Sequence, residues 1–96
     1  MYLLAIIRYL RPLDEILQHL ELHRAYLRGL EAEGILLASG PFEPRSGGAL
    51  LLRLPDGDPD AGERVRDNDP FTRQGLAAYE LLPWRPVLGL ERLDAL

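Results

Sequence analysis

The sequence predicts an α+β fold whose strands and helices follow one another in the order β-α-β-β-α-β. Three observations support this order. Four runs rich in apolar residues have the length of strands, the intervals after the first and third runs carry helical signals, and only a turn-rich stretch separates the second run from the third. Each element is justified below in chain order.

The first strand is expected at Tyr2–Tyr9, where both the odd-numbered and the even-numbered positions are mostly apolar. Arg11 and Pro12 end this strand, because proline cannot donate to a β-ladder. From about Leu13 to Glu33 the apolar spacing becomes helical, and Gly34 is a typical helix terminator. A long first helix is therefore predicted.

The second strand is predicted at Ile35–Ser39, ending at Gly40-Pro41. The residues from Glu43 to Gly48 are rich in proline and glycine, which favours a loop. Ala49–Leu54 forms the third strand. The short connection between these two strands is typical of antiparallel neighbours.

A weaker second helix is expected to run to about Arg66, with Asp58 as its N-cap and Pro59 at its first helical position. Gly62 lowers its helical propensity. We expect a loop over residues 67–70, a short helical turn over 71–75 and a fourth strand over 77–84. The tail, residues 85–96, carries several leucines that suit packing on a neighbouring subunit.

This order is the ferredoxin-like arrangement, in which both helices cover one face of an antiparallel sheet. A sheet with one wet face should alternate apolar and polar side chains, but the first and third strands are apolar on both faces. We therefore expect the open face to be a subunit interface and the protein to be a homodimer.

Composition narrows the function classes. A length of 96 residues suits one domain spanning 1–96, and a net charge of -4 without a basic patch argues against nucleic acid as a partner. Arg8 and Arg11 cut the first apolar run short of a membrane span, so no membrane contact and a cytoplasmic location are expected. Cysteine and lysine are absent, which leaves acid–base chemistry mainly to His19, His23 and the carboxylates.

His23 falls in the middle of the apolar arc of the first helix, an arc formed by Ile16, Leu20, Leu27 and Leu30. Two interpretations remain open. His23 is either a core histidine bonded to backbone or to a tyrosine, or a general base at the floor of a pocket between helix and sheet. The second interpretation requires a partner that orients the imidazole, and the periodicity does not supply one.

His19 and His23 are four residues apart, a spacing that can place two metal ligands on one helical face, with Asp69 as a conceivable third. Two ligands do not make a site, so no metal is predicted. No cofactor is expected either, because no motif for a nucleotide, a flavin or haem is present.

The chain resembles the YciI-like family, also called the YCII-related domain. The resemblance runs from His23-Arg24-Ala25-Tyr26-Leu27 through Glu33 to Pro41, and continues in Gly47-Gly48, Asp69-Pro70-Phe71 and the strand 78–84. It implies a ferredoxin-like fold in a dimeric α+β barrel-type assembly, related to muconolactone isomerases. It also implies a catalytic pair of histidine and aspartate, which falls on His23 and Asp69. Pro59 and Gly62 depart from the stronger second helix expected for the family.

The residues near this implied pair have two interpretations each. Asp69 either orients His23 or caps the turn that begins at Pro70, and both roles can coexist. The residues Ser39, Gly40 and Pro41 either line a pocket mouth or end the strand. Phe71 either walls a substrate or packs in the core, whereas Arg85 either holds an anion or is solvated.

Two functions follow. The first is a small cofactor-free lyase or isomerase (dehydrochlorinase- or muconolactone isomerase-like) that moves protons on an activated aromatic or lactone molecule with His23 and Asp69. The second is a non-catalytic dimeric module that binds a small ligand or serves as an accessory protein. Fold alone does not decide between them.

Overall fold

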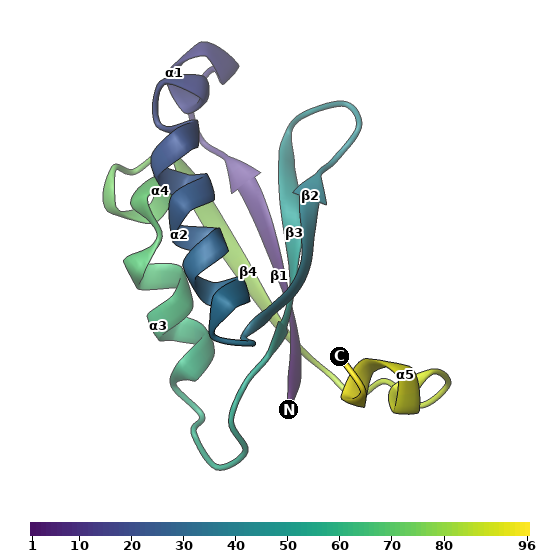
Figure 1. Cartoon of the computed structure of the whole chain (residues 1–96). Coiled ribbons are helices and arrows are strands. Elements are labelled where there is room, and N and C mark those ends of the chain that lie inside the picture. Colours follow the sequence, from purple (N-terminus) through teal and green to yellow (C-terminus); the bar gives the residue numbers. More distant parts are fainter.

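The computed structural model describes all 96 residues, and it consists of a four-stranded sheet with helices packed on one face (Figure 1). The elements in chain order are β1 (Tyr2–Tyr9), α1 (Leu13–Gln18), α2 (Leu20–Ala32), β2 (Leu36–Pro41), β3 (Gly47–Arg53), α3 (Ala61–Asn68), α4 (Pro70–Arg73), β4 (Ala77–Trp84) and α5 (Leu90–Asp94).

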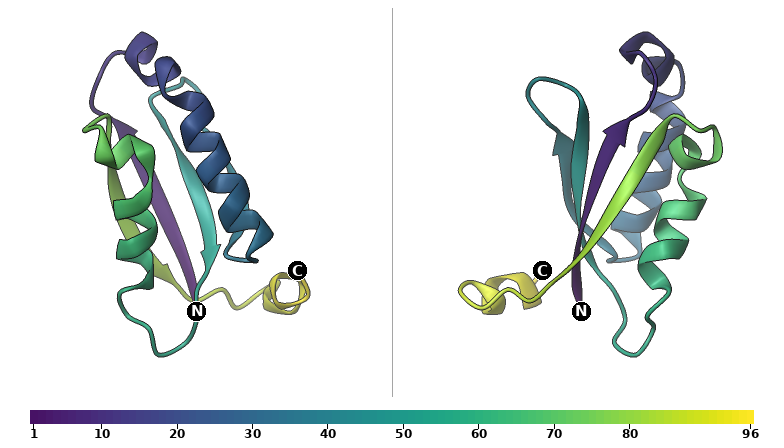
Figure 2. Two further views of the ribbon diagram at one scale, coloured as in Figure 1. Left: turned by 60° about the vertical axis from the view of Figure 1, so that its left-hand side comes forward. Right: turned by 180° about the vertical axis from the view of Figure 1, so that it is seen from behind.

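The strands lie in the order β2-β3-β1-β4, and every neighbouring pair is antiparallel. β1 is central and pairs with both β3 and β4, which explains why its sequence is apolar over almost its whole length. Helices α2 and α3 run along the same face of the sheet, as both views of Figure 2 show. The predicted α+β ferredoxin-like fold is therefore confirmed.

The first helical segment differs from the single helix that the sequence predicts. It is divided at His19, whose backbone angles (φ -111°, ψ 6°) are not helical and whose N–H bonds to the Ile16 carbonyl at 3.0 Å. This bond spans three residues, so the last turn of α1 is tightened before α2 begins. The predicted end of the helix at Gly34 is present, with φ at +78°.

The glycine pair predicted as a loop belongs to β3, because the strands come unusually close there. A Cβ atom on Gly47 would lie 1.8 Å from the carbonyl oxygen of Ile7, and one on Gly48 would lie 2.6 Å from that of Gly40. Only glycine allows these approaches. β2 continues to Pro41, and its register shifts between Leu36 and Ala38, which marks a bulge.

The second helix begins later than predicted. Asp58, expected as its N-cap, forms an ion pair with Arg64 instead, and Asp60 occupies the cap position without a side-chain hydrogen bond. α3 extends to Asn68, so residues 67–70 are not a loop. The buried Gly62 lets α3 approach the sheet, because a Cβ there would lie 2.9 Å from Leu3 Cδ1.

The hydrophobic core lies between the sheet and helices α1 to α4. Its largest fully buried side chains include Ile16, Leu52 and Phe71, which come from a helix, a strand and the short helix α4. Asp69 is buried to the same degree, with none of its surface exposed. A fully buried carboxylate requires partners, and these define the site described below.

The other face of the sheet carries no packed helix over its centre. Leu4, Ile6 and Leu51 are half-buried there, and Leu82 is 40 % exposed. At one end the C-terminal segment binds the chain itself, since Tyr2 donates to Asp94 at 2.6 Å and Arg53 donates to two carbonyls near the C-terminus. None of the helices has the length and apolar character that a membrane crossing requires.

Candidate active site

Asp69 lies at the junction of two helices, where it is both the C-cap of α3 and the N-cap of α4. Its extended backbone (φ -69°, ψ 129°) turns the chain before Pro70, and Pro70 occupies the first turn of α4. Asp69 Oδ1 accepts the N–H of Phe71 at 2.9 Å. The N-cap interpretation of Asp69 therefore holds in the structure, and it fixes the carboxylate in one orientation.

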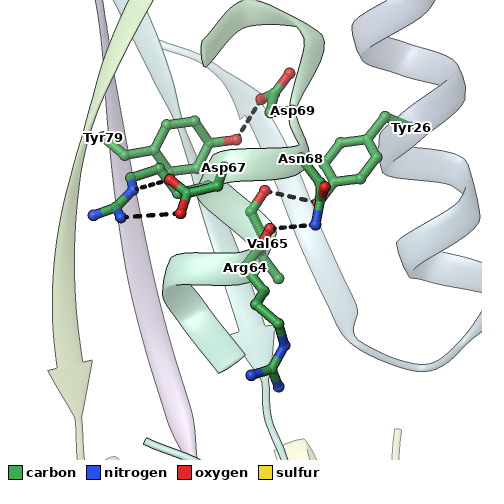
Figure 3. A network of polar contacts seen from close by, with 8 residues as sticks. Tyr26, Arg64, Val65, Asp67, Asn68, Asp69 and Tyr79 are labelled. Atoms are coloured by element: carbon green, nitrogen blue, oxygen red, sulfur yellow. Dashed lines mark hydrogen bonds and ion pairs between the residues drawn. The ribbon is translucent and has the colours of Figure 1, made fainter. Parts of the chain in front are cut away.

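Two side chains also donate to Asp69. His23 Nδ1 lies 2.8 Å from Oδ1. The Tyr79 hydroxyl donates to Oδ2, a contact that Figure 3 shows. His23 comes from α2, Tyr79 from β4 and Asp69 from the α3–α4 junction. The two residues that the family resemblance pairs, His23 and Asp69, are thus in direct contact.

The geometry around His23 distinguishes its two ring nitrogens. A carboxylate can only accept, so Nδ1 carries the proton that is shared with Asp69, and the neutral imidazole has its free lone pair on Nε2. Nε2 has no hydrogen-bond partner within the chain. Among the fully buried side-chain nitrogen and oxygen atoms, only Thr72 Oγ1 lacks such a partner, so Nε2 is not fully buried. Nε2 therefore keeps contact with solvent, although the side chain is only 10 % exposed.

Aromatic rings hold the imidazole in place. The Phe71 ring stacks on that of His23 with centroids 4.0 Å apart and planes 5° from parallel. Tyr9 meets the edge of Phe71 at 6.1 Å and 89°. Phe71, which the sequence leaves between packing and walling a pocket, therefore contacts His23 directly and is itself almost fully buried.

His23 lines a hollow of about 260 Å³ between α2 and the sheet. Ser39, Gly40, Pro41 and Phe71, which the sequence predicts near the site, line the same hollow. Asp69 does not line it and lies behind the imidazole, where water does not reach it. For comparison, an apolar protein cavity of about 150 Å³ holds benzene, so a single substituted ring fits this space.

Tyr79 is a site residue that the sequence interpretation missed, and Tyr26 is a second partly buried hydroxyl close to it. Burial and the nearby charge of Asp69 raise the pKa of Tyr79 well above its ordinary value, so its hydroxyl remains a donor to Asp69. Burial and the same charge raise the pKa of Tyr26 to about 12, and Tyr26 donates to the Val65 carbonyl at 2.7 Å (Figure 3). The alternation of side chains along β4 could have revealed Tyr79, because it places Tyr79 on the helix-covered face of the sheet together with Ala77 and Leu81.

The remaining sequence candidates lie outside this site. His19 Nδ1 lies 3.4 Å from the Glu15 carbonyl, and no group of three or more His, Asp or Glu side chains is arranged to hold a metal ion. Arg85 lines a different hollow with Trp84, near the start of β1. Two other arginines, Arg24 and Arg45, line the hollow of His23 and were not predicted.

The fold and the site together define a small α+β domain with a carboxylate-oriented histidine between helix and sheet. Such a histidine can accept a proton at Nε2 and return it, because Asp69 fixes the tautomer and stabilises the imidazolium that forms. The chain belongs to the YCII-related domain family, whose model matches residues 1–85.

Among solved structures, the chain is similar to 5-chloro-2-hydroxyhydroquinone dehydrochlorinase (TftG) from Burkholderia phenoliruptrix AC1100, in complex with 2,5-dihydroxybenzoquinone. The two share 25 % sequence identity with a TM-score of 0.75, over 91 % of this chain and 96 % of that chain. No curated protein matches the chain. The structural neighbour supports a lyase-type activity on small molecules at the level of the family.

Proposed function

We propose that this protein is a small-molecule lyase or isomerase in which His23 transfers protons and Asp69 orients it. The observation that carries the proposal is the 2.8 Å contact between His23 Nδ1 and Asp69 Oδ1 beside a hollow of about 260 Å³. The dehydrochlorinase activity of the structural neighbour supports the same reaction class. The substrate class that fits is a small ring whose protons are already acidic.

In the proposed reaction, Nε2 of His23 accepts a proton from an oxygen or carbon of the ring. The electron pair of the broken bond moves into the ring and, in an elimination, expels a leaving group such as chloride with its bonding pair. Loss of H⁺ and Cl⁻ balances without an external oxidant. In an isomerisation the protonated His23 returns the proton to another ring atom.

The neighbouring residues have proposed roles that follow from their positions. Asp69 keeps the Nδ1 proton in place and neutralises the imidazolium, while Tyr79 and the Phe71 N–H hold Asp69. Ser39, Gly40 and Pro41 line the hollow together with His23, and their proposed role is to contact the substrate. Phe71 supports the imidazole by stacking, so that only Nε2 is presented to a ligand.

The test is a turnover assay with chlorinated hydroxyquinols, chlorinated catechols and muconolactones. We expect His23→Gln to lower the rate on a turned-over substrate by about 10²–10⁴-fold, the usual contribution of a general acid–base group. His19→Gln is the matched control, because His19 is the other histidine and does not line the hollow. Turnover that survives His23→Gln would remove His23 from the mechanism and leave a binding module.

We further propose that the protein is a homodimer that buries the helix-free face of its sheet. Leu4, Ile6 and Leu51 remain half-buried on that face, and Leu82 is 40 % exposed. Because these side chains are already partly buried, each contributes only a part of the roughly 1.5–3 kcal/mol that a fully exposed side chain contributes on burial. Four neighbouring side chains of this kind make a patch that a second copy can cover with the same patch.

Analytical ultracentrifugation tests the dimer. The wild type should sediment as a dimer at micromolar concentration, and Leu82→Glu should shift it toward the monomer. Leu22→Glu is the control, because Leu22 is 60 % exposed and lies on α2, on the opposite side of the sheet from this face. A monomeric wild type would reject the proposal.

A further inference from the structure

The charges that face the hollow all have one sign. Besides His23, two charged residues line it. Arg24 follows His23 directly on α2, and Arg45 lies in the connection between β2 and β3. No aspartate or glutamate lines it. The one nearby carboxylate, Asp69, is fully buried behind the imidazole and already accepts three hydrogen bonds. The wall that meets a ligand is therefore cationic.

The two arginines are free to act on a ligand. Arg45 forms no ion pair and no side-chain hydrogen bond anywhere in the chain. Arg24 contacts Glu21 through a single nitrogen at 3.2 Å, and both of these side chains are mostly exposed. An exposed pair of this kind is weak, so most donors of Arg24 remain available.

We propose that the hollow binds its ligand as a small organic anion, and that Arg45, assisted by Arg24, determines this specificity. The inference rests on the proposed function in one respect, namely that this hollow is the site where the ligand binds. A guanidinium presents several N–H donors in one plane, which matches a carboxylate, a phenolate or an enolate oxygen. The anion would enter beside Ser39 and Gly40, and its ring would lie within reach of His23.

An anionic ligand also suits a histidine that accepts a proton at Nε2. An enolate or phenolate carries electron density that can move into the ring once a proton leaves elsewhere or a leaving group departs. A cation next to the anionic oxygen stabilises the bound form and raises the local concentration of the ligand. Because both arginines are exposed, this attraction should weaken with ionic strength.

Benzoate and benzamide are suitable probes, because they are nearly the same size and differ in charge. In an NMR titration we expect benzoate to shift the amide signals of Ser39 and Gly40 and to bind at least tenfold more tightly than benzamide. Arg45→Gln should weaken benzoate binding by about tenfold. Adding salt should weaken benzoate binding and leave benzamide unaffected.

Arg28→Gln is the matched control. Arg28 lies on the same helix, is exposed, forms no ion pair and does not line this hollow, yet its substitution changes the net charge equally. It should change benzoate affinity less than twofold. Equal affinity for the two probes, equal effects of Arg45→Gln and Arg28→Gln, or no binding of benzoate would each overturn the inference.

The outcome is separable from that of the proposed function. Benzoate is not turned over, so its binding does not depend on proton transfer by His23. If benzoate binds through Arg45 while no substrate is turned over, the anion site stands and the enzyme proposal fails. If a substrate is turned over and Arg45→Gln leaves its KM unchanged, the anion inference fails and the enzyme proposal stands.

Discussion

The molecule contains two hydrogen-bonded pairs of tyrosine and aspartate that differ in their surroundings. Tyr79 and Asp69 meet beneath the helices, where Asp69 is fully buried. Tyr2 and Asp94 meet at 2.6 Å at the C-terminal segment, where α5 lies apart from the other helices (Figure 1). The first pair shares its carboxylate with a histidine and a backbone N–H, whereas the second pair ties a terminal segment to the sheet.

The difference shows that burial makes a hydrogen bond between tyrosine and aspartate fix the positions of the elements that it joins. A carboxylate in water can exchange its partner for solvent at little cost, but a buried one cannot. The three donors on Asp69 therefore fix three elements relative to one another: α2, α4 and β4. The contact between Tyr2 and Asp94 fixes only the position of one short helix.

The largest expected effect comes from removing each carboxylate. Asp69→Ala should lower the free energy of unfolding by about 3–5 kcal/mol, because buried donors of His23, Tyr79 and Phe71 lose their acceptor. Asp94→Ala should lower it by less than about 1 kcal/mol, because solvent replaces the acceptor. Urea denaturation at neutral pH measures both values. Equal losses would contradict the contrast between the two pairs.

A smaller effect is expected from removing each hydroxyl. Tyr79→Phe should cost about 1–2 kcal/mol and loosen Asp69, which the ¹⁵N signals of the His23 ring should report as a weaker preference for the Nδ1–H tautomer. Tyr26→Phe is the control in the same region, because its hydroxyl donates to a backbone carbonyl and not to Asp69. Tyr26→Phe should reduce stability and leave the tautomer unchanged. A tautomer that also survives Tyr79→Phe would show that Tyr79 does not position Asp69.

A further effect is expected only at alkaline pH. The pKa of Tyr26 is raised to about 12 and that of Tyr79 is raised as well, above a value of 10.0 for a free tyrosine. The folded state therefore holds protons that the unfolded state releases above pH 10. The resulting stability is fully present below pH 10 and is lost as the pH rises from 10 toward the folded-state pKa of each tyrosine.

Denaturation at several pH values between neutral and strongly alkaline should show this loss. Tyr26→Phe should make the alkaline decline less steep, since one titrating group is removed. A decline of unchanged slope in Tyr26→Phe would show that other groups cause it.

Elements with a strong local pattern could be predicted from the sequence. The apolar run of β1, the helix end at Gly34 and the place of His23 on the apolar arc each follow from residues close together in the chain. His23 lies on that arc with 8 % of its surface exposed, but the periodicity could not decide between its two interpretations. Local patterns carry this information because strand and helix periods are properties of short segments.

The rest depends on contacts between distant residues. The Gly47-Gly48 pair has the composition of a turn, and only the approach of neighbouring strands shows why glycine is needed within β3. His23 and Asp69 are 46 residues apart, so their contact was expected from the family resemblance and not from any spacing. The role of Tyr79 was missed because its partner lies on another element.

Both outer strands of the sheet carry a proline, and this limits what can join the sheet. Phe42 donates its N–H inward to Gly47 at 2.9 Å, so the nitrogen of Pro41 faces outward by the alternation of an antiparallel strand. β2 also carries the bulge near Leu37, and β4 contains Pro83. An incoming strand would find a proline on either edge and, beside β2, an irregular backbone as well. Growth of this leucine-rich chain into larger assemblies by strand addition is therefore disfavoured.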